Sequence, residues 1–195
     1  MQRQEIEALL GRAVSRNGLY FPGDAGDAIP SAVLVIIHYH DNGRAKRLPR
    51  VILTKRSAHL KTHSSEISFP GGRHTKSDAS LIQTALRETE EEIGIRISER
   101  DVVGSLRAVR TMTSNHFIVP FVTIQQSFAE HRLQALEVEE LIDAPLLDIL
   151  KSISADTEHY GLARDAVRFT FGDYVIWGAT ARILKQLYEI LIRPS

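Results

Sequence analysis

The stretch "FPGGRHTKSDASLIQTALRETEEEIGI", residues 69–95, decides the fold that this sequence predicts. Apolar residues recur in its centre with the spacing of one helix face, so we predict a helix over about residues 78–93. Asp78 or Ser77 is the expected N-cap, and Gly94 fits the left-handed position that follows a helix. The buried stripe of this helix is expected to contain Ile82, Ala85, Leu86, Thr89 and Ile93.

The last turns of the same helix carry glutamates at positions 88, 90, 91 and 92. Like charges four residues apart, such as Glu88 and Glu92, repel by about 0.2–0.5 kcal/mol. Each carboxylate also faces the negative end of the helix dipole, at a cost of roughly 0.3–1 kcal/mol. A solvated acidic face is the ordinary explanation for a run of glutamates, but these costs and the flanking glycines favour a functional cluster.

The helical period divides these glutamates into two groups. With about 3.6 residues per turn, Glu88, Glu91 and Glu92 fall on one face of the helix, whereas Glu90 projects elsewhere. Carboxylates that share a partly enclosed volume stay ionised when cations neutralise them, and their hard oxygens suit Mg²⁺ or Mn²⁺. Arg87, four residues before Glu91, can orient one carboxylate. The sequence therefore predicts a metal platform at the end of this helix.

A glycine pair precedes the helix, in the sequence "FPGG". Glycine permits positive φ and brings the backbone close to a ligand, so this loop can present a carbonyl to the metal platform. No "GKS" or "GKT" follows the glycines, which excludes a phosphate-binding loop of the Walker type. The stretch thus predicts a loop-helix-loop motif.

Composition limits the class of protein. The chain has 195 residues, 43% of them hydrophobic and 25% charged, so we expect one domain over 1–195, with an N-terminal helix and loop in 1–28 and the core in 30–185. Lysine plus arginine equals aspartate plus glutamate at 24 each, which argues against a nucleic-acid partner. The apolar run 32–37 is shorter than the roughly 20 residues of a membrane span, so no membrane partner is expected. The absence of cysteine and of a signal-peptide pattern is consistent with the cytoplasm.

The rest of the chain interleaves strand and helix patterns without strict alternation. This arrangement favours an α/β sandwich with a mixed sheet over a doubly wound parallel sheet. Strands are expected at 32–39, 50–54, 102–110, 117–125 and about 138–142. Helices are expected at 145–151 and 174–191, and a hairpin through Tyr160 and 167–171.

The loop-helix-loop stretch resembles the signature of the Nudix hydrolases. The matching residues are Gly72, Asp78, Arg87, Glu88, Thr89, Glu91, Glu92, Gly94 and Ile95. Asp78 replaces the usual glutamate and lies one residue farther from Arg87 than usual, and Thr89 occupies a normally apolar place. The resemblance implies a Nudix-type α/β/α sandwich with a mixed β-sheet, in which Glu88, Glu91 and Glu92 hold Mg²⁺ or Mn²⁺ with help from the Gly72 carbonyl.

A second motif lies upstream, in "ILTKRSAHLKTHSSEISFPGG", residues 52–72. It resembles the pattern that precedes the signature in the coenzyme A pyrophosphatases of the superfamily. The matching residues are Ile52, Leu53, Thr54, Arg56, Ser57 and Phe69 to Gly72. Lys61 stands at the second arginine position of the pattern and Ser65 at its glycine position. The resemblance implies that Arg56 and Lys61 bind the phosphates of a small nucleotide substrate.

The function that the resemblance implies is metal-dependent hydrolysis of the diphosphate in coenzyme A or its derivatives, to 3′,5′-ADP and 4′-phosphopantetheine. Arg87, Glu88, Glu91 and Glu92 are then the catalytic group, and Glu140 in "EVEELID" is the candidate general base, with an exposed strand acid as the alternative. Two other functions stay open, a Nudix pyrophosphatase for ADP-ribose or NADH and a non-catalytic nucleotide-binding module. A homodimer is compatible with the sequence, which does not determine the oligomeric state.

Overall fold

A computed structural model describes residues 1–15, 22–39, 48–58, 66–111, 113–127, 131–158 and 166–193. The helices are α1 (Arg3–Ala13), α2 (Leu81–Ile93), α3 (Leu146–Lys151) and α4 (Gly178–Leu191), with short 3₁₀ turns η1 (Pro22–Ala25) and η2 (Glu99–Asp101). The strands are β1 (Ile29–Tyr39), β2 (Pro49–Arg56), β3 (Ile67–Ser68), β4 (Gly71–Arg73), β5 (Val102–Ser105), β6 (Val109–Arg110), β7 (His116–Gln125), β8 (Val138–Pro145), β9 (Ser154–Ala155), β10 (Val167–Phe171) and β11 (Tyr174–Ile176).

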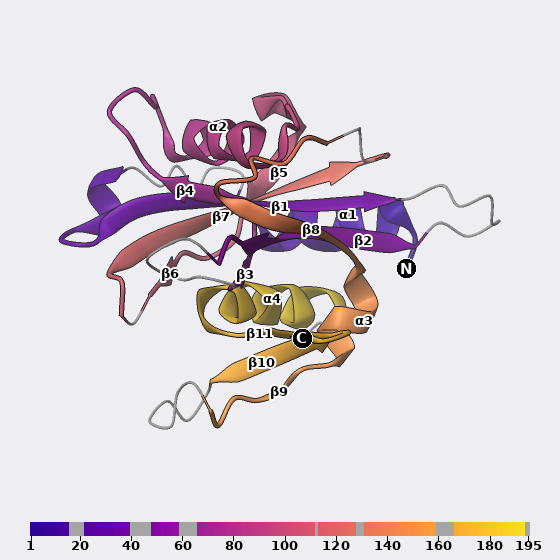
Figure 1. Cartoon of the computed structure of the whole chain (residues 1–195). Coiled ribbons are helices and arrows are strands. Elements are labelled where there is room, and N and C mark those ends of the chain that lie inside the picture. Colours follow the sequence, from indigo (N-terminus) through magenta and orange to yellow (C-terminus); the bar gives the residue numbers. More distant parts are fainter. Residues whose placement is uncertain are drawn as a thin grey trace.

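A mixed sheet forms the centre of the fold, with the strand order β3-β2-β1-β7-β5. β1 runs parallel to β7 and antiparallel to β2, while β4 adds to β1, β6 to β7 and β8 to β2. Helix α2 covers one face of the sheet, and α4 lies on the other face together with the smaller sheet β9–β11 (Figure 1). This arrangement confirms the predicted α/β/α sandwich with a mixed sheet.

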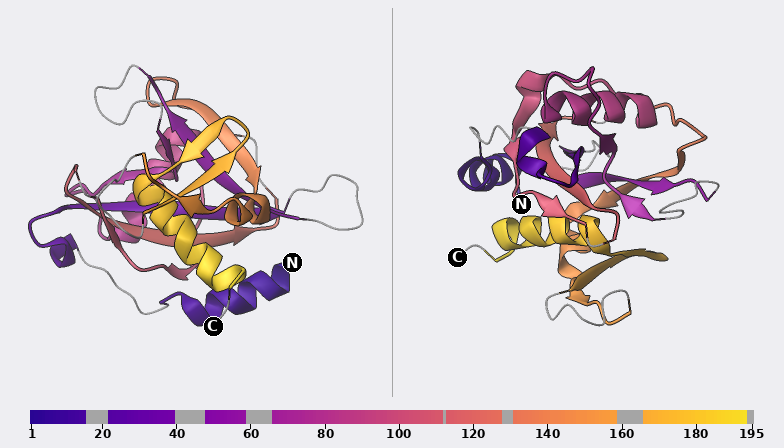
Figure 2. Two further views of the ribbon diagram at one scale, coloured as in Figure 1. Left: turned by 90° about the horizontal axis from the view of Figure 1, so that it is seen from below. Right: turned by 90° about the vertical axis from the view of Figure 1, so that its left-hand side faces the viewer.

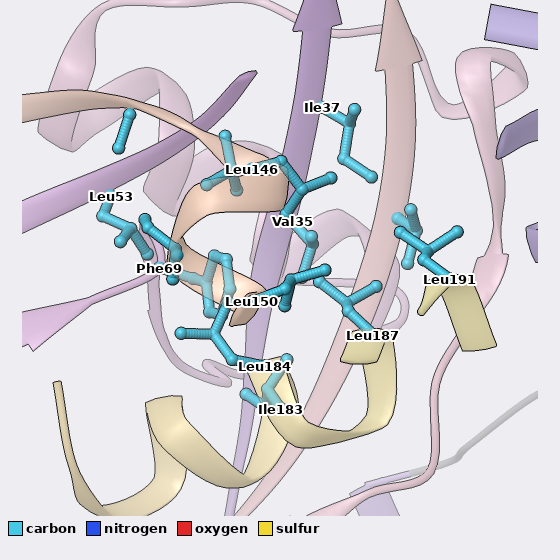
Figure 3. Packing of buried hydrophobic residues seen from close by; sticks show 14 of the residues in the cluster. Val35, Ile37, Leu53, Phe69, Leu146, Leu150, Ile183, Leu184, Leu187 and Leu191 are labelled. Atoms are coloured by element: carbon cyan, nitrogen blue, oxygen red, sulfur yellow. The ribbon is translucent and has the colours of Figure 1, made fainter. Parts of the chain in front are cut away.

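The two faces of the sheet are buried in separate apolar clusters. Alternate residues of a strand point to opposite faces, so Leu34 and Ile36 of β1 pack toward α2, whereas Val35 and Ile37 pack toward α1, α3 and α4. Figure 3 shows the second cluster, in which Leu184 and Leu187 of α4 approach the side chains of β1. Burial on both faces explains why β1 and β7 are long apolar runs.

Helix α2 begins three residues later than the sequence pattern suggested. Its N-cap is Ser80, whose hydroxyl accepts a hydrogen bond from the backbone N–H of Gln83 at 3.3 Å. The predicted caps, Ser77 and Asp78, were wrong because the Asp78 carboxylate bonds instead to Arg87. Gly94 takes the left-handed conformation predicted for it, with φ of 72°.

The C-terminal helix also begins later than predicted. Residues Tyr174–Ile176 form β11, which pairs with β10, so the helix starts at Gly178 and not at residue 174. Together α1 and α4 pack on the same side of the sheet, where the views of Figure 2 place them next to each other.

The other predicted strands and helices agree with the structure in part. The single strand predicted over 102–110 is divided into β5 and β6, while the other predicted strands and the helix near 145–151 are confirmed, with shifted ends. Tyr160 lies outside the described residues. Of the helices in the described part of the chain, none combines the length and the apolar character that crossing a bilayer requires.

Candidate active site

Strand β4 and helix α2 bring the glycine pair against the glutamates. Gly71 and Gly72 pair with Val33 and Ala32 of β1, which fixes the loop on the sheet beneath α2. A Cβ atom added to Gly72 would lie 2.5 Å from the Glu88 Oε2 atom, closer than two such atoms approach in a protein. Any larger residue at this position would therefore require the Glu88 carboxylate to move away from the loop.

Glu92 is the most buried carboxylate of the acidic turn, with 3% of the residue exposed. Its Oε2 atom accepts a hydrogen bond from the Gly71 N–H at 3.0 Å, and its Oε1 atom lies 3.9 Å from Arg56 Nη1. Burial raises the pKa of Glu92 to about 7, because the Gly71 N–H and the Arg56 charge only partly offset the lost hydration. Glu92 is therefore an acid that needs a cation to become fully ionised near neutral pH.

Glu88 and Glu91 converge on one nitrogen atom. Arg87 Nη1 lies 2.9 Å from Glu88 Oε1 and 2.9 Å from Glu91 Oε2. Burial raises the pKa of Glu88 although the Arg87 charge acts to lower it, whereas the Glu91 side chain is 59% exposed. The three glutamates on this face of α2 therefore differ in solvent exposure: Glu92 is buried, Glu88 is partly buried and Glu91 is exposed.

Arg87 is held by Asp78 through two parallel hydrogen bonds. Its Nε atom donates to Asp78 Oδ1 at 2.8 Å and its Nη2 atom to Asp78 Oδ2 at 2.9 Å. The Asp78 side chain is 4% exposed and also accepts hydrogen bonds from the Thr75 N–H and the Thr84 hydroxyl, both at 3.0 Å. The hydrogen bonds from Arg87 hold the pKa of Asp78 well below its ordinary value. The substitution of aspartate for the usual glutamate therefore preserves a bidentate anchor for Arg87.

Two other features of α2 follow from local bonding. Thr89, at the normally apolar place, is fully buried, and its hydroxyl donates to the Ala85 carbonyl at 2.7 Å, so its polar atom is satisfied within the helix. Glu90 points away from the other glutamates and pairs with Arg96 at 2.5 Å. This pairing is consistent with the predicted exclusion of Glu90 from the metal-binding face.

The donor atoms fit a divalent cation, although they are not yet arranged around one. Among the described residues, no three histidine, aspartate or glutamate side chains stand close enough to hold a metal ion together. The set nevertheless consists of hard oxygens, two of which, on Glu88 and Glu91, already converge on a cationic nitrogen. The third carboxylate, Glu92, has its nearest described cationic partner 3.9 Å away. The chemistry of these three carboxylates therefore suits a divalent cation, while Arg87 and Arg56 are the cationic side chains that the structure places beside them.

The upstream motif contributes Arg56, at the end of β2, to the surroundings of Glu92. Arg56 closes β2 and its guanidinium approaches Glu92. Among the described residues, the buried Arg56 Nε atom has no hydrogen-bond partner. Lys61, the other residue expected to bind phosphate, lies outside the described residues. Of the predicted substrate residues, the structure brings Arg56 to the carboxylates.

Glu140 lies on the other face of the sheet. Along β8, Glu140 shares a face with Ile142 and Ala144, which belong to the cluster beneath α4. Its Oε1 atom accepts a hydrogen bond from the Tyr174 hydroxyl at 2.7 Å. The structure therefore does not bring Glu140 to Glu88, Glu91 and Glu92.

Glu137 is the acidic residue that the sequence analysis missed. It precedes Val138, which pairs with Arg56 in the β2–β8 ladder, and its backbone carbonyl accepts a hydrogen bond from the Ser57 N–H at 2.9 Å. Its negative charge contributes to the raised pKa of both Glu88 and Glu92. The alternation in "EVEE" separates Glu137 from Glu140, but the sequence alone did not indicate which face α2 covers.

The family model described as NUDIX domain matches residues 29–158. The chain therefore belongs to the NUDIX family. It is a Nudix hydrolase, and hydrolases of this family act on pyrophosphate bonds and generally use divalent ions such as Mg²⁺ or Mn²⁺.

Relatives and solved structures support the same family. An uncharacterized Nudix hydrolase NudL from Yersinia pestis (strain Pestoides F) is 33% identical over 173 residues, which cover 82% of this chain and 86% of the relative. The NUDIX domain of Shewanella oneidensis NrtR, solved with ADP ribose, has a TM-score of 0.58 at 20% identity and covers 97% of this chain and 98% of that one. A MutT/nudix family protein from Enterococcus faecalis has a TM-score of 0.59 at 13% identity, over 95% of this chain and 73% of that one. These structures are similar to this chain in fold.

Proposed function

We propose that this Nudix hydrolase cleaves the diphosphate linkage of coenzyme A or its derivatives, releasing 3′,5′-ADP and 4′-phosphopantetheine. The observation that carries this proposal is the position of Arg56, which belongs to the upstream motif and lies 3.9 Å from the buried Glu92. A cation at the edge of a carboxylate site is suited to a substrate that brings several phosphates. The guanidinium of Arg56 and the carboxylates of the same site would then bind opposite charges, the substrate phosphates and the metal ions.

Each residue has a defined role in this proposal. Glu88, Glu91 and Glu92, with the Gly72 carbonyl, would hold Mg²⁺ or Mn²⁺, and a bound ion supplies charge neutralisation at the phosphates and a lower pKa for a nearby water. Arg87, anchored by Asp78, orients Glu88 and Glu91. The shared face of Glu88, Glu91 and Glu92 on α2 supports this proposed metal-binding role.

The hydrolytic step needs a group that takes a proton from water. In our proposal Glu137 accepts this proton as the water oxygen forms a bond to one phosphorus atom of the diphosphate. The bond from that phosphorus to the bridging oxygen breaks, the bridging oxygen leaves on the other phosphate, and the two products are 3′,5′-ADP and 4′-phosphopantetheine. Arg56 and Lys61 bind the phosphates of the substrate. Glu140, the earlier candidate, is replaced in this role because it bonds to Tyr174 on the opposite face.

Comparison of substrates tests the proposal. With Mg²⁺ or Mn²⁺ present, the purified protein should hydrolyse coenzyme A or acetyl-coenzyme A with a higher kcat/KM than ADP-ribose or NADH, and chromatography should identify 3′,5′-ADP. Preference for ADP-ribose would instead support the second Nudix function, which Lys61 and Ser65 favour because they replace an arginine and a glycine of the coenzyme A pattern. Binding without hydrolysis of any of these compounds would indicate a nucleotide-binding module.

Arg56→Ala tests the phosphate-binding role. We expect it to raise KM for coenzyme A by about 10-fold or more, since a hydrogen bond to a charged group contributes roughly 1.5–3 kcal/mol. KM for dephospho-coenzyme A, which lacks the 3′-phosphate, should change less if Arg56 contacts that phosphate. Arg96→Ala is the control, because Arg96 is exposed and pairs with Glu90. An equal rise in KM for both substrates would show that Arg56 does not contact the 3′-phosphate.

A further inference from the structure

The C-terminal end of α2 is closed by a distant segment of the chain. A helix leaves its last carbonyl groups without partners inside the helix. In α2, the Ile93 carbonyl accepts a hydrogen bond from the Arg132 N–H and the Glu92 carbonyl accepts one from the Gln134 N–H, each at 2.9 Å. Residues 131–137, which we call the strap, therefore supply backbone donors to the turn of the helix that carries Glu92.

The other end of the strap carries Glu137. The Glu137 N–H donates to the Gln134 carbonyl at 2.9 Å, so Glu137 is one short turn away from the residue that bonds to the helix. The Glu137 carbonyl in turn accepts from Ser57, next to Arg56. The strap is thus fixed at both ends of the site, by α2 on one side and by the end of β2 on the other.

Gly94 touches the strap where it crosses the helix end. A Cβ atom added at Gly94 would lie 3.0 Å from both the backbone N and O atoms of Arg132. Gly94 also has φ of 72°, a conformation that side chains other than glycine rarely adopt. Any larger residue at this position must therefore displace the strap at Arg132, in addition to straining the helix cap.

We propose that Gly94 is a positioning residue, which lets the end of α2 hold the strap, and with it Glu137, between the turn that carries Glu92 and the end of β2. The helix that carries the proposed metal-binding glutamates thereby also sets the backbone position of Glu137. The kinetic part of this inference rests on the proposed hydrolysis, whereas the structural part does not.

Hydrogen exchange tests the structural part in the whole chain. In Gly94→Ala, the amides of Arg132 and Gln134 should exchange at least about 10-fold faster than in the wild type, because their acceptors move. Gly172→Ala is the matched control, since Gly172 has φ of 54° but no atom within 4 Å of an added Cβ, so it carries the same type of backbone strain without a steric contact. Unchanged exchange at Arg132 and Gln134 in Gly94→Ala would overturn the inference.

A double-mutant cycle tests whether Gly94 acts through Glu137. We expect Gly94→Ala to lower kcat several-fold in the wild-type background and to have little further effect in Glu137→Gln, because both changes disturb the same carboxylate. Equal factors in the two backgrounds would show that Gly94 has only a structural role. If the protein hydrolyses no diphosphate, the proposed function fails while the exchange experiment still decides whether the strap depends on Gly94.

A second pair of variants covers the case in which Gly94→Ala does not fold. Gln134→Pro removes the N–H that bonds to the Glu92 carbonyl, whereas Gln134→Ala keeps it. We expect Gln134→Pro to lower kcat and to accelerate exchange at Arg132, and Gln134→Ala to resemble the wild type in both measurements. Identical behaviour of the two variants would contradict the inference.

Discussion

Glu92→Gln is expected to lower kcat by about 10²–10³-fold while the protein keeps its fold. Losing one carboxylate at the metal removes several kcal/mol of transition-state stabilisation, and each 1.36 kcal/mol corresponds to a factor of about 10. Steady-state kinetics with saturating Mg²⁺ or Mn²⁺ measures the loss, and circular dichroism monitors the fold.

Glu90→Gln is the matched control for this experiment. Glu90 lies two residues away on the same helix, but it is exposed and pairs with Arg96. We expect its turnover to stay close to that of the wild type. Near-normal activity of Glu92→Gln, or an equal loss in both variants, would show that the metal platform is not formed by the face that carries Glu88, Glu91 and Glu92.

Although Glu92→Gln should lower kcat, we expect the same substitution to stabilise the metal-free protein above neutral pH. The pKa of Glu92 in the folded protein is raised to about 7, above its ordinary value, so the folded state holds a proton that the unfolded state has released. The contribution of Glu92 to the free energy of unfolding is therefore fully present below pH of about 4.5 and is lost as the pH rises to about 7, by up to about 3 kcal/mol. At pH 8, metal-free Glu92→Gln should unfold at a higher temperature than the wild type, and the difference should vanish at pH 4.

A requirement of the proposed metal site, met at a cost in stability without metal, accounts for the closely spaced glutamates in "RETEEEIGI". The repulsion and the unfavourable dipole were visible in the sequence, because they depend only on spacing along a helix. The period also separated Glu90 from the other three residues. The depth of each residue was not visible, since it depends on the sheet beneath α2, which buries Glu92 and leaves Glu91 exposed.

The misassigned residues share one physical cause. Asp78 has the composition of a helix cap, but a capping bond is weaker than a buried bidentate contact with Arg87, so the tertiary partner determines its position. Glu137 and Glu140 are three positions apart, so the alternation along a strand separates them. Only the burial of Ile142 and Ala144 beneath α4 shows which of the two faces carries Glu140. The mixed sheet itself was predictable, because the order and length of the apolar runs limit how the strands can be connected.

Asp78→Asn is expected to destabilise the protein by about 3 kcal/mol at pH 7. Removing one member of a buried ion pair leaves the other charge without compensation, a change that costs roughly 3–5 kcal/mol in fully buried pairs. The lower end applies here because the Arg87 side chain is 27% exposed, while that of Asp78 is 4% exposed, and because Arg87 keeps its contacts with Glu88 and Glu91. For a chain of this size the melting temperature should fall by roughly 6–12 °C, as measured by thermal unfolding.

The exposed pair of Asp27 and Arg110 provides the control, and pH provides the independent test. Asp27→Asn breaks an aspartate–arginine contact in which the two side chains are 85% and 51% exposed, so its melting temperature should stay close to that of the wild type. The pKa of Asp78 is lowered in the folded protein, so its stabilisation is present above the ordinary aspartate pKa of about 4 and is lost as the pH falls through the folded value. The difference between the wild type and Asp78→Asn should therefore be constant from pH 5 to pH 8 and should shrink below pH 4. A difference that persists unchanged at lower pH would mean that the side chain acts by packing and not by its charge.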